Sequence, residues 1–507
     1  MKLLLFRPNS EVYSALPPLG FLSLAAYLRQ YGGHEVRIFD GRLKCASDSG
    51  IAGQVEDFQP DIIGVGLLSM ERQVGHHALL YLRKKFPQTP LIMGGPYPTS
   101  EPLDALKNEA VDFLVQNEGE IPALNLLNAM QYGGDFSTIR GLVYRRQGEV
   151  VINAPEDFIE DLDSIPDYAW DLIHLPDYYQ CKGRGTQMNI YKKYVESAPL
   201  QVTRGCPYQC TYCQNFMGRK FRRRSAERVI EELRFLKRTY GVREIEFIDD
   251  TFNLNLKYAK NFYRALIDAD LGLYYSYPNG LRADRMDEEL VDLMKQAGVF
   301  RIVYGIESGS PRIQKTMKKN LDLEKARQMI ALTAGKNISV GSFYMLGFLD
   351  ETEEEMRRSI NFAVESKAHT ASFFLLNPYP NTEIYRQALE AGYQLQDTKY
   401  GHYYSLCSNI SKVSGERILS LRNYAYRRFF FNPVRLIRLI RTTPFMLFFF
   451  KIMIIGIYML FVKVKEDKRT PIGSSSDEGI YKKSWVLRLL YRHTGLSNTG
   501  KTAVKLK

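Results

Sequence analysis

Three cysteines, Cys206, Cys210 and Cys213, constrain this chain of 507 residues more than any other feature. They stand in the stretch Thr203-Arg-Gly-Cys-Pro-Tyr-Gln-Cys-Thr-Tyr-Cys, so three thiolates share one short loop. Three thiolates can hold three irons of a 4Fe–4S cube, whereas an electron carrier supplies a fourth cysteine. Structural zinc also needs four protein ligands, and the next histidine after Cys213 is His369. The motif therefore predicts a cube with one iron open to a cofactor or a substrate.

This spacing, with the aromatic Tyr212 just before the last cysteine, resembles the motif of the radical S-adenosylmethionine superfamily. The resemblance implies that the open iron binds the amino and carboxylate groups of S-adenosylmethionine. An electron from the cluster then splits the sulfonium to give a 5′-deoxyadenosyl radical. The three cysteines are accordingly the expected metal ligands and catalytic residues, and Tyr212 is expected beside the cofactor through its backbone and ring position.

Residues 1–150 alternate short apolar runs with amphipathic segments, which predicts a doubly wound, Rossmann-like parallel sheet. A helix is expected over 19–30, and strands are expected over 2–8, 35–40, 61–69, 90–94 and 112–115. Ligands of such sheets bind beyond the carboxyl ends of the strands. Four candidate binding residues follow those ends: Ser69, Gly94, Gly95 and Glu118. Glycines there allow a bulky ligand to approach the backbone closely.

Over roughly residues 1–395 the order of domains resembles the cobalamin-binding branch of the same superfamily. The first domain is then expected to hold cobalamin. The Asp-x-His-x-x-Gly motif that supplies a cobalt ligand in many cobalamin proteins is absent, because Asp40 is followed by Gly-Arg-Leu. We therefore expect cobalamin without a histidine ligand from the protein. The alternative is that Gly94-Gly95-Pro96 is only a turn.

Residues 151–195 are rich in proline and acidic residues and are predicted to be a surface linker. From 196 to 395 the strand–helix rhythm resumes and predicts a partial (β/α)6 barrel, whose reactions occur at the carboxyl ends of its strands. Candidate cofactor contacts there are Asp249, Glu307, Ser308 and Asn377. Asp249 could bind ribose hydroxyls. The family resemblance places Glu307 and Ser308 against S-adenosylmethionine and Asn377 near its adenine, although Asn377-Pro could equally be a turn.

Residues 396–507 are predicted to form a helical region with a membrane-associated segment at 445–462, which is apolar except for Lys451. The basic, apolar stretch 427–441 precedes it, and residues 463–507 hold eleven Lys or Arg against four Asp or Glu. A membrane span at 445–462 would carry that positive tail across the membrane, which is unfavourable. An anchor lying in the membrane interface is therefore favoured. A full span and a buried helix of a third domain remain alternatives.

The six cysteines form no disulfide framework, and low-potential iron–sulfur chemistry needs a reducing compartment. We therefore expect a cytoplasmic enzyme at the inner face of the membrane, reduced by a ferredoxin or flavodoxin and without a nucleic-acid partner. The leading hypothesis is a cobalamin-dependent methyltransferase that acts on an unactivated carbon of a lipid, isoprenoid or tetrapyrrole. The alternatives are a radical carbon–carbon bond former or cyclase, and a non-catalytic cobalamin or redox sensor.

Overall fold

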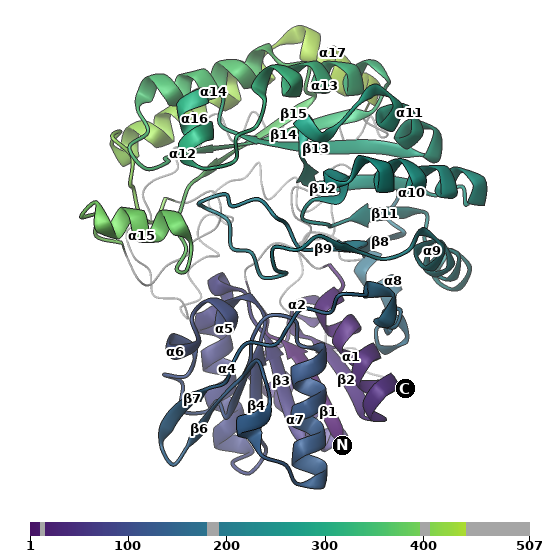
Figure 1. Ribbon diagram of the computed structural model, residues 1–507, viewed down its shortest axis with the longest axis vertical. Coiled ribbons are helices and arrows are strands. Elements are labelled where there is room, and N and C mark those ends of the chain that lie inside the picture. The colour runs from purple at the N-terminus through teal and green to yellow at the C-terminus, as the bar shows by residue number, and fades with distance from the viewer. Residues whose placement is uncertain (11–15, 180–191, 396–405, 443–507) are drawn as a thin grey trace, which may run out of the picture.

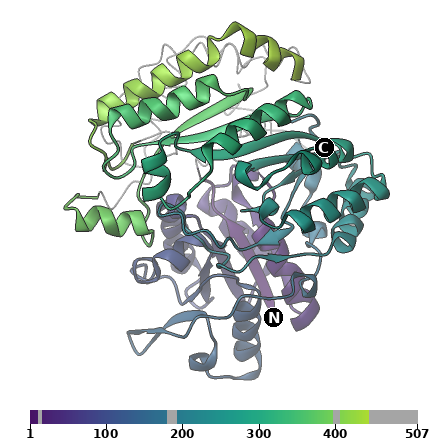
Figure 2. The same cartoon turned by 45° about the horizontal axis from the view of Figure 1, so that its top comes forward.

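The computed structural model describes residues 1–10, 16–179, 192–395 and 406–442. They form two α/β domains, the amino-terminal one below and a barrel-like one above, with the cysteine loop running between them (Figure 1). The same loop remains between the domains when the molecule is turned by 45° (Figure 2). The chain leaves the first sheet at Ile152 and enters the second at Ser197.

The first sheet has the order β2-β1-β3-β4-β5-β6-β7. Its strands are β1 (Lys2–Arg7), β2 (Glu35–Asp40), β3 (Ile62–Gly66), β4 (Leu91–Gly94), β5 (Phe113–Val115), β6 (Leu142–Arg146) and β7 (Glu149–Ile152). The five predicted strands are all parallel, as expected. The sequence analysis missed β6 and β7, which add an antiparallel hairpin. Its two-residue turn places Gln147 and Gly148 at positive φ, a geometry that suits tight hairpins.

Helices cover both faces of this sheet, which explains why β1 is apolar at four successive positions. Leu3 and Leu5 pack with α1 (Leu19–Gly32) and α7 (Glu120–Tyr132). Leu4 and Phe6 pack on the other face with α3 (Asp48–Phe58) and α4 (Arg72–Lys85). The carboxyl ends of the strands face the second domain.

The second sheet is an open, parallel array of six strands in the order β15-β14-β13-β12-β11-β8. The strands are β8 (Ser197–Leu200), β11 (Glu244–Phe247), β12 (Tyr274–Leu281), β13 (Val299–Glu307), β14 (Ser339–Leu346) and β15 (Thr370–Leu375). The helices that cover it are α9 (Ala226–Tyr240), α10 (Leu256–Ala269), α11 (Glu288–Ala297), α13 (Leu323–Gly335), α14 (Glu353–Glu365) and α16 (Gly415–Phe430). This is the predicted six-stranded partial barrel.

The connector between the domains is more than a surface linker. Trp170 is only 1% exposed and donates a hydrogen bond from Nε1 to Glu232 on α9, 2.8 Å away. Leu175 in α8 (Leu175–Tyr179) is also fully buried in the barrel core. The connector therefore buries the indole of Trp170 against α9. This contact was not predicted, because the connector sequence has little hydrophobic periodicity.

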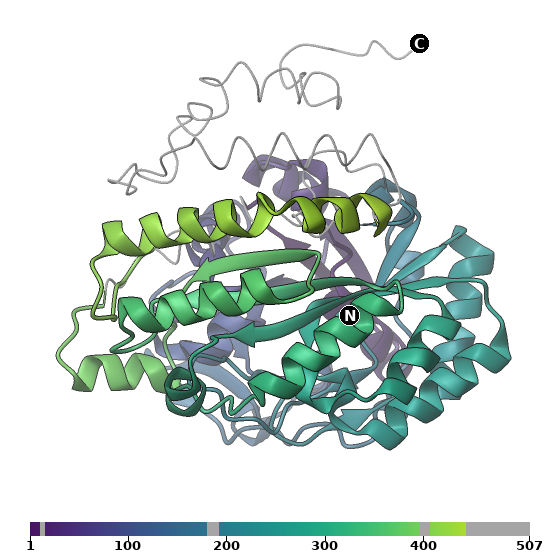
Figure 3. The ribbon, with the colours of Figure 1, turned by 90° about the horizontal axis from the view of Figure 1, so that it is seen from above.

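The carboxyl-terminal helices α16 and α17 (Pro433–Thr442) lie along the outside of the barrel (Figure 3). Arg435 of α17 is 1% exposed and donates hydrogen bonds to carbonyls at the end of α14, including Val364 O at 2.7 Å and Ser366 O at 3.0 Å. Arg435 of the basic stretch 427–441 therefore faces the barrel. A search of the described helices found none with the length and apolarity needed to cross a membrane. The predicted segment 445–462 lies outside the described residues.

Candidate functional site

The cysteine loop is closed at its base by a two-stranded antiparallel ribbon. Strand β9 (Thr203–Arg204) enters the loop, and β10 (Arg222–Arg223) leaves it. Gly205 has φ +86°, and a Cβ there would come 2.0 Å from Lys220 O. Only glycine fits this close approach of two backbones. Cys206 N then donates to Gly218 O at 3.0 Å, which fixes the first cysteine at the start of the loop.

The three cysteines share this loop at the mouth of the barrel. Cys213 N donates to Cys210 O at 3.1 Å, and Thr251 Oγ1 donates to Cys206 Sγ at 3.2 Å. Burial raises the pKa of Cys210, and burial together with the neighbouring thiols raises that of Cys213 to about 12. Such a group needs a nearby positive charge to ionise fully, and cluster irons would supply it.

No three His, Cys, Asp or Glu side chains within the described ranges converge closely enough to hold one metal ion. A cube places different demands on its ligands, because each thiolate binds a different iron.

Tyr212 anchors the loop against the barrel. Its ring packs edge-on against Phe348 with centroids 5.8 Å apart. On the preceding residue, Thr211 N donates to Met317 O at 3.0 Å, and Thr211 O accepts from Ile384 N at 2.9 Å. The expected position of Tyr212 beside S-adenosylmethionine stays a prediction.

Glu307 ends β13 with φ +65°, a conformation that non-glycine residues rarely adopt. Lys319 Nζ lies 2.9 Å from Glu307 Oε1, and both side chains are about nine-tenths buried. Lys319 also counteracts the burial that raises the pKa of Cys210, so its ammonium lies near the cysteines. A carboxylate and an ammonium beside the cluster loop match the amino and carboxylate groups of an amino-acid ligand. The sequence analysis missed Lys319, because Lys318-Lys319 looks like a solvated charged pair.

Three other predicted cofactor contacts have hydrogen-bond partners within the protein. Ser308 Oγ is fully buried and shares a hydrogen bond with Ser359 Oγ at 3.0 Å. Asn377 Oδ1 accepts from Cys407 N at 2.8 Å. Asp249 Oδ1 accepts from Val202 N at 2.9 Å and from the backbone and hydroxyl of Thr203, while burial raises its pKa to about 7. Asp249 Oδ2 is buried without a hydrogen-bond partner among the described residues. The cofactor contacts of Ser308, Asn377 and Asp249 stay predictions.

At the predicted cobalamin-binding edge of the first sheet, the backbone at Gly95 packs closely against the backbone of Leu67. Gly95 has φ +96°, and a Cβ there would lie 3.0 Å from Leu67 O. Gly94 is less constrained, since the nearest atom to its Cβ position is 3.8 Å away. Ser69 begins the short helix after β3, and its Oγ is buried without a hydrogen-bond partner among the described residues. A buried, unpaired hydroxyl next to bare backbone fits a polar group on a bulky planar ligand.

Arg42 stands where the Asp-x-His-x-x-Gly motif would place its histidine. Its guanidinium is buried against Glu71 and donates from Nε to Ser10 Oγ at 3.0 Å. Asp40 itself pairs with Arg7 and caps the short helix α2 (Gly41–Lys44). A buried ionic network thus lies at the carboxyl ends of β1 and β2, where Arg7 and Asp40 are the last strand residues.

Glu118, which was predicted to touch the ligand, pairs with two arginines, and its contact with the ligand stays a prediction. Its two oxygens lie 3.1 Å from Arg204 Nη1 and 2.9 Å from Arg222 Nη1. Oε2 also accepts from Ile159 N at 3.0 Å. The carboxylate is therefore committed to the two strands that frame the cysteine loop.

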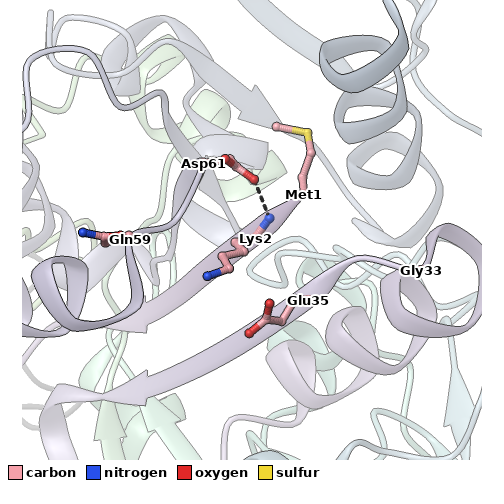
Figure 4. Close-up of a pocket in the computed structure, with 6 residues that line it drawn as sticks. All are labelled: Met1, Lys2, Gly33, Glu35, Gln59 and Asp61. Atoms are coloured by element: carbon pink, nitrogen blue, oxygen red, sulfur yellow. Dashed lines mark hydrogen bonds between the residues drawn. The ribbon is translucent and has the colours of Figure 1, made fainter.

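A surface hollow of about 520 Å³ lies far from all of these groups. Met1, Lys2, Gly33, Glu35, Gln59 and Asp61 line it, and Lys2 N donates to Asp61 Oδ2 at 2.7 Å (Figure 4). It sits at the amino-terminal ends of β1 and β2. Because parallel sheets bind ligands at the opposite edge, this hollow is not the predicted site.

Comparison with known proteins agrees with this geometry. Residues 200–363 match the family model of the radical SAM superfamily, and residues 9–127 match that of the B12 binding domain. An uncharacterized methyltransferase of Pyrococcus horikoshii is 32% identical over 86% of this chain and 94% of its own length. The cytidylyl-2-hydroxyethylphosphonate methyltransferase of Streptomyces wedmorensis is 28% identical over 77% of this chain and 82% of its own. The anaerobic magnesium-protoporphyrin IX monomethyl ester cyclase of Synechocystis is 26% identical over 76% of both chains.

Two solved structures share the whole two-domain arrangement. The radical S-adenosylmethionine methyltransferase TsrM from Kitasatospora setae, with cobalamin and a 4Fe–4S cluster bound, aligns with a TM-score of 0.67 and 18% identity over 85% of this chain and 86% of its own. The cobalamin-dependent radical enzyme OxsB aligns with a TM-score of 0.71 and 17% identity over 97% and 79%. The chain is a radical enzyme whose cofactors are a 4Fe–4S cluster, S-adenosylmethionine and cobalamin. It belongs to the cobalamin-binding branch of the radical S-adenosylmethionine superfamily.

Proposed function

We propose that this enzyme methylates an unactivated carbon of a lipophilic substrate, such as a lipid, an isoprenoid or a tetrapyrrole. The bound cofactors supply the radical that removes a hydrogen atom and the methyl group that replaces it. The protein's part is to bind, align and exclude water. Cys206, Cys210 and Cys213 would hold the cluster, and Glu307 with Lys319 would orient the amino-acid end of S-adenosylmethionine. Ser69, Gly94 and Gly95 would support the corrin.

The lining of the barrel mouth is the observation that supports a lipophilic substrate. In β14, Tyr344 and Leu346 belong to the core between strands and helices. Because side chains alternate along a strand, Phe343 and Met345 face the barrel interior. Phe343 packs edge-on against Phe374 of β15 with centroids 5.3 Å apart, and both rings keep partial exposure. Such a wall favours an apolar substrate over a charged one.

Methylation is favoured over cyclisation because relatives along most of the chain are named methyltransferases. Cyclisation remains the second candidate function. A relative that aligns with three quarters of this chain is named a magnesium-protoporphyrin IX monomethyl ester cyclase. Deleting the gene and comparing lipids and pigments by mass spectrometry tests both. We expect loss of a species that is one methyl group heavier than the compound that accumulates. Accumulation of an uncyclised tetrapyrrole would support the cyclase instead, and no change in either class would contradict both.

With purified enzyme, the reaction products distinguish methylation from cyclisation. Methylated substrate with S-adenosylhomocysteine supports the transferase, whereas 5′-deoxyadenosine without S-adenosylhomocysteine supports the cyclase. A sensor would bind the cofactors yet produce no 5′-deoxyadenosine with dithionite. A ferredoxin or flavodoxin is the proposed physiological reductant, and a cytoplasmic location follows from that need.

Contact with an anionic membrane is also proposed, as a route to such a substrate. The outward side of α17 exposes Val434 and Ile437, and Phe431 just before the helix is 66% exposed. Arg427 and Arg428 are exposed on the preceding helix. Apolar side chains flanked by arginines suit the lipid interface. Flotation with phosphatidylglycerol vesicles should recover the protein. Phe431→Ser with Val434→Ser and Ile437→Ser should reduce that recovery, and equal recovery would contradict the contribution of this face.

A further inference from the structure

The cysteine loop is tied to the cobalamin domain by a buried network of four charged side chains. Arg204 reaches Glu120 Oε1 at 2.8 Å as well as Glu118, and its Nη2 donates to Ser23 Oγ at 3.0 Å. Arg222 reaches Glu118 from the other strand of the ribbon. The four side chains are only 1% to 9% exposed. Both ends of the cysteine loop are thus held by residues that follow β5 of the first sheet.

The opposite charges within this network offset the effect of burial on each other's pKa. Burial alone would raise the pKa of Glu120, but the Arg204 guanidinium outweighs it and holds that pKa below its usual value. The two carboxylates in turn outweigh the burial of Arg204 and raise its pKa. Both partners therefore stay charged across the physiological range. Removing one would leave an uncompensated charge between the domains.

A buried ion pair contributes little net stability compared with apolar packing, but its geometry is demanding. This network links the cysteine loop to the edge of the first sheet where cobalamin is expected. Arg204 stands two residues before Cys206, and Glu118 follows a strand that pairs directly with β4, which ends at Gly94. A second tie lies on the other side of the cluster motif, where Gln214 Nε2 donates to Ser100 Oγ of α5 (Pro96–Ser100) at 3.3 Å. The network therefore sets the register between the cluster loop and the cobalamin-binding edge.

We propose that Glu118 is a positioning residue that fixes the distance and orientation between the iron–sulfur cluster and the cobalamin, acting through Arg204 and Arg222. It touches neither cofactor in this role. The proposal rests on the assigned cofactors and does not depend on which substrate is methylated. Losing this carboxylate should loosen the register between the two domains, while each cofactor keeps its own ligands.

The test uses the full chain, reconstituted without oxygen with iron, sulfide and cobalamin. Pulsed dipolar electron paramagnetic resonance measures the distance between the reduced cluster and cob(II)alamin. Wild-type protein should give one narrow distribution. Glu118→Gln should broaden it or shift it to longer distance, with iron and cobalamin content unchanged. Glu118→Asp, which keeps the charge, should restore part of the narrow distribution.

Glu232→Gln is the matched control. Glu232 forms an equally buried pair with Arg224 at 2.6 Å, and its partners Arg224, Tyr168 and Trp170 all lie outside the first sheet. Its distance distribution should match wild type. Glu120→Gln is the second variant if Glu118→Gln does not fold, and it should broaden the distribution by loosening Arg204.

An unchanged distribution in a folded Glu118→Gln protein would overturn the proposal. Selective loss of cobalamin from Glu118→Gln, with the cluster retained, would also overturn it, because Glu118 would then be a binding group. Cleavage of S-adenosylmethionine under dithionite is measured in parallel. Absence of 5′-deoxyadenosine in the wild type would count against the proposed function and would leave the distance result to judge this inference by itself.

Discussion

Thr251 and Cys206 are joined by a hydrogen bond from the threonine hydroxyl to the cysteine sulfur across 3.2 Å. Thr251 follows the carboxyl end of β11 and is only 3% exposed, whereas Cys206 begins the cluster motif on another strand end. Hydrogen bonds to ligating sulfurs tune the potential of an iron–sulfur cluster. This hydroxyl therefore links the second βα unit of the barrel to the chemistry of the first.

Replacing Thr251 by Val should make the cluster harder to reduce. The hydroxyl stabilises the more negative, reduced state, so its loss should lower the reduction potential. A net hydrogen bond of about 1 kcal/mol corresponds to roughly 40 mV for a one-electron couple. Potentiometric titration followed by electron paramagnetic resonance measures the shift. Thr251→Ser keeps the donor and should stay near wild type, and an equal shift in both variants would exclude the hydrogen bond as the cause.

Substituting Cys206, Cys210 or Cys213 by Ala should each abolish the cluster. Three thiolates are the fewest that can hold a cube with one open iron, so the loss of one removes a required ligand. Iron and sulfide content should fall, and dithionite-driven formation of 5′-deoxyadenosine should disappear. Cys45→Ala is the control, because Cys45 is exposed and lies in the other domain. Full cleavage activity in any of the three variants would contradict the assignment.

Local signals gave most of the elements. The strand predicted over 35–40 is β2, and the helix predicted over 19–30 is α1, which Gly33 ends in a left-handed conformation. Alternation, caps and apolar runs are properties of neighbouring residues, so one sequence suffices to read them. The β6–β7 hairpin was not predicted, because β7 is exposed at three of its four positions and has no clear apolar pattern.

Partners that meet only in the fold were harder to predict. A carboxylate after a parallel strand can bind a ligand or a group of the protein. Here Glu118 pairs with Arg222, and Asp249 accepts a hydrogen bond from Val202 N. Lys319, which follows α12 (Pro311–Thr316), and Thr251, which follows β11, approach the cysteine loop from distant parts of the chain, and no local spacing predicts this contact. The spacing of the three cysteines is local, so one sequence suffices to propose them as metal ligands. The partners of Glu118, Asp249 and Lys319 lie far away in the chain, so they could not be predicted in the same way.

Replacing Glu351 by Gln should remove part of the pH dependence of stability. Burial raises the pKa of this carboxyl to about 8, although Gly347 N and Phe348 N donate to it. Between about 4.5 and 8 the folded protein holds a proton that the unfolded chain has released. The free energy of unfolding therefore falls as the pH rises through this window. Thermal unfolding at several pH values should show that the stability of Glu351→Gln, relative to wild type, increases toward pH 8. A constant difference between the two proteins across this range would contradict the assigned pKa.

Replacing Arg435 by Met should destabilise the barrel even though it removes a charge from the core. The guanidinium donates to the carbonyls of Ala368 at 3.0 Å and Phe429 at 2.7 Å, besides those at the end of α14. Methionine fills a similar volume but leaves these buried acceptors unpaired, at a cost of about 3 kcal/mol. The denaturation midpoint should fall accordingly. Arg438→Met, one turn later, loses a single donation to Lys367 O at 3.1 Å and should change the midpoint much less. Equal effects of the two substitutions would contradict the special role of Arg435 in securing α14.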